Sequence, residues 1–254
     1  MSDSASTQTP PDHAQRNKEY WDKRGEEAFK SEYIRKLYLQ VDQKFTRITS
    51  TWLSLSPATP LPKLLDYACG NGAGTRLLRP YFEEVVGVDI APNMVEAYNK
   101  QFEADSKIRG IAGDISSDDA AEIEKLSDEQ YFNFDFAIIV MALHHVPDPA
   151  RTIRDLIGRV KVGGSVVVVD WIDDGHLMGV SPETKGTAEE LAEAKKAIET
   201  VTKHGFTQEE LVDLFKKAGC EDEGIKVDIN EEVSEVPVRK GNPHFFVARG
   251  IRKA

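Results

Sequence analysis

The chain has 254 residues, of which 40% are hydrophobic and 30% charged, a composition that suits one globular domain with a sizeable core. A formal net charge of -11 and a pI near 5.1 give a surface that repels phosphate backbones, which argues against a nucleic-acid substrate. Two cysteines, Cys69 and Cys220, are too few for a disulfide framework, and no apolar stretch is long enough for a membrane span. The sequence therefore predicts a soluble, cytoplasmic protein.

The N-terminal part divides into a tail, a helical segment and a joint. Residues 1–12 are rich in Ser, Thr and Pro and predict a disordered tail without the apolar core of a secretory signal. Residues 13–55 are predicted to be helical, because apolar side chains such as Leu37 and Val41 recur at helical intervals. The proline-rich residues 56–62 then mark the entry to the main domain. We therefore expect a helical cap at 13–62 before a domain at 63–254.

Apolar strand segments alternate with helical segments from residue 63 onward. Pro92 is well placed to begin a helix that extends to residue 102, and Asp148 with Pro149 is expected to cap and begin another. The four consecutive valines at 166–169 suit a strand buried on both faces. This alternation predicts a parallel sheet covered by helices. The strands are expected at 63–68, 85–90, 108–112, 134–140 and 165–171, with a turn at 161–164.

The alternation breaks after Trp171. Residues 172–206 contain a polar loop and a charged helix that begins with the capping-box sequence Thr187-Ala188-Glu189-Glu190. A second capping box at Thr207 opens a helix that is expected to stop at Gly219. Two strand-like segments, 225–229 and 244–251, complete the chain.

The main chemical signal is a strand, a glycine-rich turn and a helix start, with the sequence Leu64-Leu65-Asp66-Tyr67-Ala68-Cys69-Gly70-Asn71-Gly72-Ala73-Gly74-Thr75. Glycines allow a ligand to approach the backbone beside the positive end of a helix dipole. Asp66 would repel a pyrophosphate but suits a cationic amino group, and Asp89 can accept hydrogen bonds from both hydroxyls of a ribose. Asp114, at the end of the third strand, can accept from an adenine amino group. Carboxylates at three consecutive strand ends predict a site for a ligand with these three parts.

The stretch from about Leu64 to Lys253 resembles the class I S-adenosylmethionine-dependent methyltransferases, and among them the small-molecule type 11 methyltransferase domain. The resemblance implies an α/β fold with a doubly wound, seven-stranded sheet in the order 3-2-1-4-5-7-6. It also implies that the last strand is antiparallel, that helices cover both faces, and that an N-terminal helical lid and a lid or substrate insertion at 172–206 enclose the acceptor. The matching pieces are Asp66–Gly72, Gly87-Val88-Asp89, Gly113-Asp114-Ile115, Phe134-Asp135, Ala142-Leu143-His144-His145-Val146 and Lys161-Val162-Gly163-Gly164.

The resemblance implies that S-adenosylmethionine is the cofactor and assigns residues to it. Asp66 and the glycine turn would line the methionine end, Asp89 would bind the ribose, and Asp114 with Ile115 would lie at the adenine. Residues just after the fourth strand would pass beside the sulfonium. Tyr20, Trp21 and Arg24 of the N-terminal helix would either close over the cofactor or face the core. The full set of expected cofactor-binding residues is Tyr20, Asp66, Ala68, Cys69, Gly70, Asn71, Gly72, Asp89, Ile90, Met94, Asp114, Ile115, Val140 and Met141.

Two further groups of polar residues have both a functional and a structural interpretation. A histidine near the methyl group, His144 or His145, could act as general base for a hydroxyl acceptor, but the favoured interpretation of the pair is structural packing. Asp170, Asp173 and Asp174 could bind a divalent metal ion, but the favoured interpretation is an acidic loop. No metal is therefore expected.

The predicted activity is transfer of a methyl group to an oxygen, nitrogen or sulfur nucleophile of a small molecule. No catalytic residue is assigned, because a sulfonium methyl group is already activated and the protein mainly aligns the nucleophile and excludes water. One alternative is an idle domain that binds the cofactor as a scaffold. A less favoured alternative is an NAD-dependent oxidoreductase. Thr75 argues against it, because this residue stands where the dinucleotide-binding motif GxGxxG has its third glycine. We expect a small-molecule acceptor, no nucleic-acid or membrane partner, and a monomer or homodimer.

Overall fold

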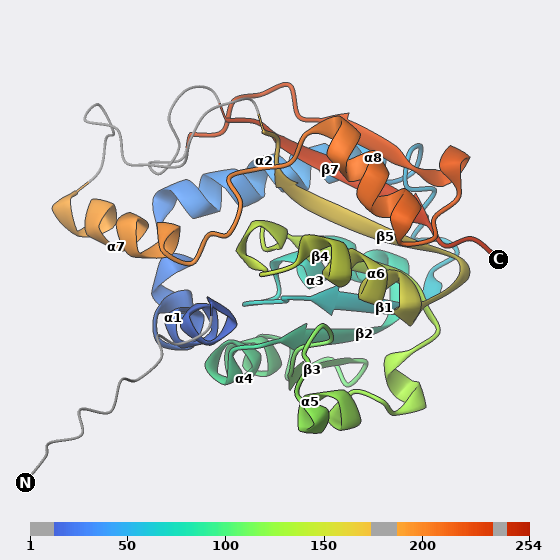
Figure 1. Ribbon diagram of the computed structural model, residues 1–254, viewed down its shortest axis with the longest axis horizontal. Helices are drawn as coiled ribbons and strands as arrows, with labels where there is room; N and C mark the ends of the chain where they lie inside the picture. The colour runs from blue at the N-terminus through green and yellow to red at the C-terminus, as the bar shows by residue number, and fades with distance from the viewer. Residues whose placement is uncertain (1–12, 174–186, 236–242) are drawn as a thin grey trace, which may run out of the picture.

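The computed structural model describes residues 13–173, 187–235 and 243–254 (Figure 1). The expected tail at 1–12, Asp174 and part of the expected lid at 172–206 lie outside the described residues. Within the described part of the chain, no helix is long and apolar enough to cross a membrane.

Two helices, α1 (His13–Ala28) and α2 (Glu32–Ile48), precede the sheet. The single helical segment expected at 13–55 is therefore divided, and it ends earlier than expected. The division falls at Ser31, whose backbone is extended and whose Oγ donates to the carbonyl oxygen of Ala28 at 2.7 Å. The buried stripe of α2 comes from the apolar residues at helical spacing, which confirms the interpretation of that pattern. Its apolar members are Leu37, Val41, Phe45 and Ile48, and Lys44 is buried among them.

Seven strands form one sheet in the order β3-β2-β1-β4-β5-β7-β6, which confirms the predicted topology. The first five pair in parallel, and β7 is antiparallel to both of its neighbours. The strand order reverses between β1 and β4, and ligands of doubly wound sheets bind at such a switch point. The strands are β1 (Leu61–Tyr67), β2 (Phe82–Asp89), β3 (Ile108–Ala112), β4 (Phe134–Val140), β5 (Val160–Trp171), β6 (Lys226–Ile229) and β7 (Phe245–Ile251).

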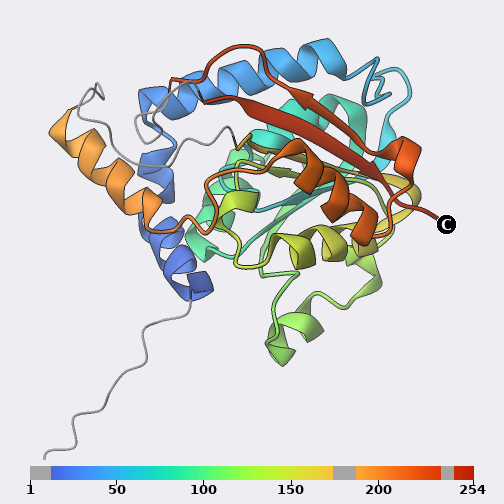
Figure 2. The same cartoon turned by 45° about the horizontal axis from the view of Figure 1, so that its top comes forward.

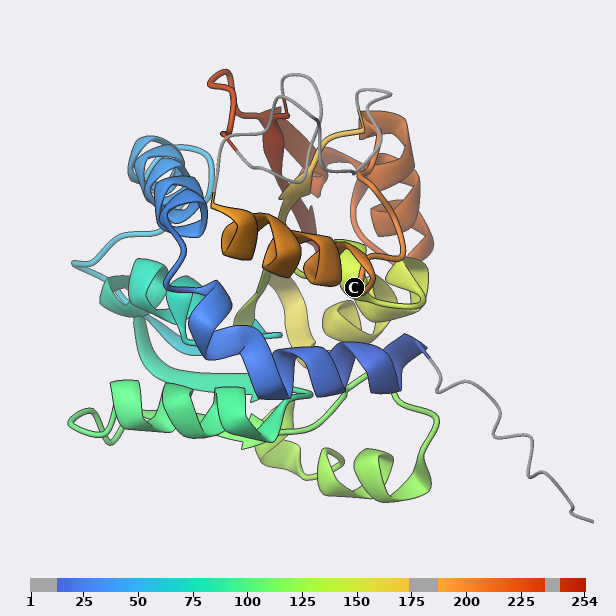
Figure 3. The ribbon, with the colours of Figure 1, turned by 90° about the vertical axis from the view of Figure 1, so that its left-hand side faces the viewer.

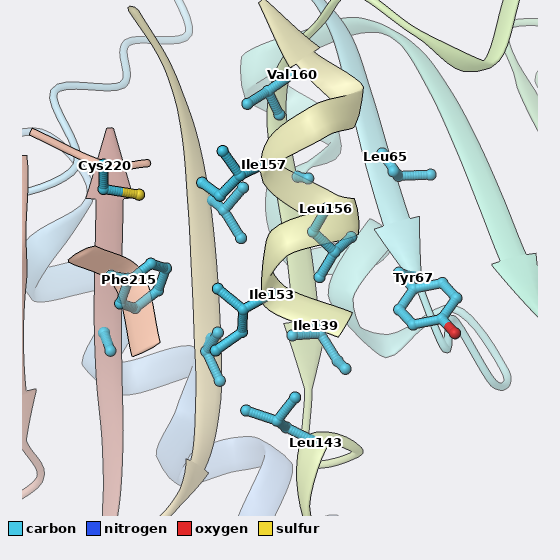
Figure 4. Packing of buried hydrophobic residues seen from close by; sticks show 14 of the residues in the cluster. Leu65, Tyr67, Ile139, Leu143, Ile153, Leu156, Ile157, Val160, Phe215 and Cys220 are labelled. Carbon is cyan, nitrogen blue, oxygen red and sulfur yellow. The ribbon is translucent and has the colours of Figure 1, made fainter. Parts of the chain in front are cut away.

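Helices cover both faces of the sheet (Figures 1 and 2). Side chains of successive strand residues point to opposite faces, so Val167 and Val169 of β5 belong to one core cluster and Val166 and Val168 to the other. The first cluster includes residues of α2, α3 (Ala73–Leu78) and α4 (Pro92–Gln101). The second, shown in part in Figure 4, includes residues of α6 (Pro149–Arg159) and α8 (Gln208–Lys217). The short α5 (Ala120–Lys125) follows β3, and α7 (Ala188–Ile198) follows β5.

The predicted helix starts agree with the structure. Pro92 and Pro149 occupy first-turn positions, and the side chain of Asp148 accepts from the backbone N–H of Arg151 at 3.0 Å. Thr207 caps α8 by accepting from the N–H of Glu210 at 3.1 Å. These local signals hold because each satisfies a backbone N–H that the helix itself leaves without a partner.

The turn expected at 161–164 is instead an irregularity within β5. Phe134 pairs with Val160, and the next pairing joins Phe136 to Ser165, so the intervening residues of β5 form a bulge. The bulge stays in the sheet because Gly164 accepts from the N–H of Arg252 at 2.9 Å, beside β7. Hydrogen bonds to a distant part of the chain therefore extend the strand through a turn-like sequence.

Gly72 is a position at which we expect a side chain to be harmful. It precedes α3 with φ +84°, and an added Cβ would lie 2.4 Å from Cε2 of Phe102. Gly72→Ala should therefore lower the free energy of unfolding by about 1–3 kcal/mol in urea denaturation. Gly158→Ala in α6 is the matched control, since no atom lies within 4 Å of its added Cβ, and it should be neutral or stabilising by about 0.5–1 kcal/mol. Similar losses in both variants would contradict this account of Gly72.

Candidate active site

A cavity of about 650 Å³ lies at the carboxyl ends of the central strands, where the switch point of the sheet predicts a ligand. The ends of β1, β2 and β4 form its floor, and residues of α1, α2 and α7 form its walls. Eight of the residues expected to bind the cofactor line it, namely Ala68, Gly70, Asp89, Ile90, Met94, Asp114, Val140 and Met141. Six do not belong to its lining, namely Tyr20, Asp66, Cys69, Asn71, Gly72 and Ile115.

Unusual backbone conformations concentrate at the cavity floor. Ala68 and Met141 both have φ 53°, and they are two of the four non-glycine residues with positive φ in the described chain. Ala68 directly follows β1 and Met141 directly follows β4, and both residues line the cavity. Residues held in this region are strained and cluster at ligand sites. The strain thus independently marks the strand ends that the sequence pattern indicated.

Asp89 holds the glycine turn and faces the cavity. Its Oδ2 accepts from the N–H of Gly70 at 2.8 Å, and its Oδ1 accepts from the N–H of Ala91 at 2.9 Å. Burial raises the pKa of Asp89 to about 6, although these two hydrogen bonds act in the opposite direction. A carboxylate has about four acceptor positions, so each oxygen can accept one hydroxyl in addition to its backbone partner.

Asp66 points toward α3 instead of into the cavity. Its Oδ2 accepts from Oγ1 of Thr75 at 2.7 Å, and Oγ1 of Thr75 lies 2.7 Å from the hydroxyl of Tyr98. Burial raises the pKa of Asp66 to about 7, with hydrogen bonds from Thr75 as the main opposing cause. The neighbouring Cys69 is a buried free thiol whose pKa is raised, chiefly by burial. Both residues therefore support the turn from beneath.

Asp114 lies at another end of the cavity. Its Oδ1 accepts from the hydroxyl of Tyr67 at 2.7 Å and from the N–H of Ser116 at 2.9 Å. Ser116 and Ser117 continue the same wall, and Arg151 reaches it from α6, donating to the carbonyl oxygen of Ser117 at 3.0 Å. This polar corner contrasts with the apolar walls elsewhere.

The N-terminal helices contribute residues to the cavity wall, and Figure 3 shows α1 and α7 lying in front of the sheet when the molecule is viewed from the left-hand side of Figure 1. The backbone N–H of Asn93 in α4 donates to Asp22 of α1 at 2.7 Å, and Nε2 of His13 lies 2.9 Å from the carbonyl oxygen of Thr200, just after α7. Trp21, adjacent to the expected Tyr20, is the α1 aromatic residue that lines the cavity. The ring of Tyr20 meets it edge-on with centroids 5.1 Å apart.

Sequence reasoning named Trp21 as a candidate to close over the cofactor and missed the rest of the aromatic wall that α1 and α2 supply. Its residues follow the same helical spacing as core residues, and spacing alone does not distinguish a cavity wall from a packed core. Only the position of the helices over the strand ends separates the two. The aromatic residues concerned are Trp21, Phe29, Tyr33 and Tyr38, with Trp171 at the end of β5.

His144, His145 and Asp170 form a buried polar cluster beside the cavity. Nδ1 of His144 lies 2.7 Å from Oδ1 of Asp170, and both histidines line the cavity. Asp170 also accepts from the backbone N–H groups of His144 and Trp171 at 3.0 and 2.7 Å. Asp170 is thus engaged with a histidine and two amides, and in the described residues no group of acidic, histidine or cysteine side chains is arranged to hold a metal ion.

Comparison with known proteins identifies the family of this chain. A methyltransferase-domain family matches residues 31–224. The chain belongs to this family. It is a class I S-adenosylmethionine-dependent methyltransferase of the type 11 kind, and S-adenosylmethionine is its cofactor. The family assignment disfavours the alternative of an NAD-dependent oxidoreductase.

Some proteins similar to this methyltransferase are named after a small molecule. An uncharacterized methyltransferase of Schizosaccharomyces pombe is 28% identical over 81% of this chain and 68% of its own length. The 2-methyl-6-phytyl-1,4-hydroquinone methyltransferase of Synechocystis is 29% identical over 54% of this chain and 41% of its own length. The structure of magnesium protoporphyrin IX methyltransferase from Synechocystis has a TM-score of 0.62 at 11% identity, covering 97% of this chain and 100% of that one. That likeness shows the shared fold.

The cavity suits the cofactor chemically. Its floor supplies carboxylates and backbone groups, and Gly70 has φ +49° with Phe29 so close that an added Cβ would lie 3.0 Å from Cζ of that ring. The absence of a side chain at Gly70 therefore lets the ring of Phe29 pack closely against the glycine turn at the floor. Carboxylates at Asp89 and Asp114 match hydroxyl and amino donors, and the apolar walls match the uncharged parts of the ligand.

Proposed function

We propose that this methyltransferase transfers a methyl group to an oxygen, nitrogen or sulfur nucleophile of a small, largely apolar molecule. The observation that carries this proposal is the aromatic wall of the cavity, to which Trp21, Phe29 and Tyr38 contribute. Helices α1, α2 and α7 contribute residues around the cavity, which suits a small acceptor better than a folded protein or a nucleic acid. The hydroquinone and porphyrin named for its relatives are consistent with this class.

We infer that the cofactor lies along the strand ends, with Asp89 at the ribose and Asp114 at the adenine. S-adenosylmethionine supplies a methyl group on a positively charged sulfur, which leaves as a neutral thioether. Val140 and Met141 would pass beside that sulfur, because Val140 ends β4 and Met141 follows it, and β4 is adjacent to β1 at the switch point. The roles of Tyr20, Asp66, Cys69, Asn71, Gly72 and Ile115 remain predictions, and the structure favours support of the turn for Asp66 and Cys69.

The protein's own contribution is alignment and exclusion of water. The aromatic walls would hold a flat acceptor in place, and α1 and α7 would keep water from the reacting atoms. Positioning of this kind is worth up to about 7–11 kcal/mol in well-oriented systems.

The division into a cap at 13–62 and an insertion at 172–206 also remains a prediction, as does a monomeric or homodimeric state.

The proposal is tested by titration and turnover. Calorimetry should show one-site binding of S-adenosylmethionine and S-adenosylhomocysteine and none of NAD. Incubation with S-adenosylmethionine and a panel of aromatic alcohols, amines and thiols should then give methylated product, detected by mass spectrometry. Cofactor binding without methylation of any panel member would contradict the small-molecule proposal and favour the scaffold alternative, whereas binding of NAD alone would contradict the cofactor.

A further inference from the structure

The cavity wall contains a histidine that is held on two sides. His144 belongs to a short 3-10 helix (Leu143–His145) after β4, and Asp170 lies on β5. Nδ1 of His144 lies 2.7 Å from Oδ1 of Asp170, and the backbone N–H of His144 donates to Oδ2 of the same residue at 3.0 Å. From the opposite side, the backbone N–H and Oγ1 of Thr202 donate to the carbonyl oxygen of His144 at 2.9 and 3.0 Å. The position of His144 is therefore fixed by two separate segments.

The two ring nitrogens of His144 differ in their surroundings: Nδ1 is buried, and Nε2 is available to a ligand. Nδ1 is buried beside Asp170, although the ring is turned so that this nitrogen is not aligned for a straight hydrogen bond. Among the described residues, no hydrogen bond reaches Nε2, and His144 lines the cavity. Asp170 is fully buried and, as a neighbour of Nδ1, favours the tautomer with its proton on that nitrogen. That tautomer leaves a lone pair on Nε2.

His145 is different in its surroundings. Its Nδ1 lies 3.0 Å from the carbonyl oxygen and 2.9 Å from Oγ1 of Thr200, and its ring meets that of Trp21 edge-on. Burial lowers the pKa of His145 well below its ordinary value, with His144 as the next cause and His13 as a smaller one. No carboxylate of the described chain forms an ion pair with it, so a proton gained there has no such compensation. The pair is therefore asymmetric, with only His144 beside a buried acid.

We propose that His144 is a general base, positioned by Asp170, and that the methyl acceptor is a phenol. This inference rests on the proposed function and specifies its nucleophile. A phenol has a pKa of about 10 and is mostly protonated near neutrality, whereas a neutral amine or a thiolate can attack without a base. The phenol oxygen bonds to the methyl carbon, the pair of the carbon–sulfur bond goes to sulfur, and the hydroxyl proton goes to Nε2 of His144. The imidazolium that results is paired with Asp170 and then releases its proton to solvent.

The inference predicts selective damage in His144→Gln. The probes are phenol and 2-naphthol, each paired with its sulfur analogue, thiophenol or 2-naphthalenethiol, at pH 8, where the sulfur compounds are already thiolates. His144→Gln should lower the rate of phenol methylation by about 100-fold or more and leave thiol methylation within about threefold. His244→Gln is the matched control, because Nδ1 of His244 instead contacts the carbonyl oxygen of Asn230 at 2.8 Å. It should retain both rates.

Each other result has a definite meaning. Equal loss of phenol and thiol methylation in His144→Gln, with cofactor binding retained, would show a structural role and overturn the inference. Methylation of thiols but not phenols by the unaltered protein would also overturn it while leaving the proposed function intact. Methylation of none of the four probes would contradict the proposed function itself.

A second measurement needs neither cofactor nor acceptor. In protein labelled with nitrogen-15 at histidine, the His144 signals, assigned by their loss in His144→Gln, should show a protonated Nδ1 and a bare Nε2 at pH 8. Asp170→Asn should remove this preference, and a thermal melt of that variant would establish that it is folded. A proton on Nε2 of His144 in the unaltered protein at pH 8 would overturn the assignment of this residue as a base.

Discussion

Replacement of Asp89 by alanine is expected to raise the Kd for S-adenosylmethionine by about 100- to 1,000-fold. In the proposed complex both ribose hydroxyls donate to this carboxylate, and hydrogen bonds to a charged group contribute about 1.5–3 kcal/mol each. The variant also leaves the N–H groups of Gly70 and Ala91 without their acceptor, which loosens the turn that forms the cavity floor. Both effects act in the same direction on the Kd, which calorimetric titration measures.

Two comparisons separate these effects. Asp89→Asn retains an oxygen that can accept one of the backbone N–H groups, so its loss of affinity should reflect the ligand contact more than the turn. Asp213→Ala removes the same charge from an exposed position on α8, where the residue pairs with Lys217 at 2.6 Å, and should bind the cofactor within about threefold of the unaltered protein. If Asp89→Ala did so as well, the placement of Asp89 at the ribose would be wrong.

Replacement of Asp66 by asparagine should change how stability depends on pH. Burial raises the pKa of Asp66 from 3.8 to about 7, so between these values the folded protein binds a proton that the unfolded chain does not. The stability that this proton contributes is present at low pH and is lost as pH rises toward 7. Asparagine does not titrate. The free energy of unfolding of Asp66→Asn, relative to that of the unaltered protein, should therefore increase by on the order of 2–4 kcal/mol from pH 4 to pH 8.

Urea denaturation of both cofactor-free proteins across that pH range measures the difference directly. Asp89 has a pKa raised to about 6 and contributes a similar trend in both proteins, so the comparison reports mainly on Asp66. Asp105 is a control of opposite sign, because its hydrogen bond from Arg79 lowers its pKa. Asp105→Asn should therefore become relatively less stable only as pH rises toward 3.8, and its difference from the unaltered protein should be nearly constant between pH 4 and pH 8. A constant difference between Asp66→Asn and the unaltered protein would show that Asp66 has the same pKa in the folded and unfolded states, which would contradict its raised pKa.

The sequence by itself determined the strand and helix pattern and the positions of most of the cavity floor. β4 begins and ends where the apolar run 134–140 does, because a strand buried on both faces needs continuous apolar residues. The parallel order then brings the ends of β1, β2 and β3 to one edge, where Ala68, Asp89 and Asp114 line the cavity. These features follow from local hydrophobicity and turn residues, which act over a few positions of the chain.

Only the tertiary structure decided which side chains line the cavity. Asp66 turns toward Thr75 because α3 packs above it, and Trp21 reaches the cavity because α1 is joined to α4 and to the segment after α7. His144 and Asp170 are 26 positions apart, and the pairing of β4 with β5 brings them together. A motif fixes where a strand ends, but the direction of a side chain at that end depends on what packs against it from elsewhere in the chain.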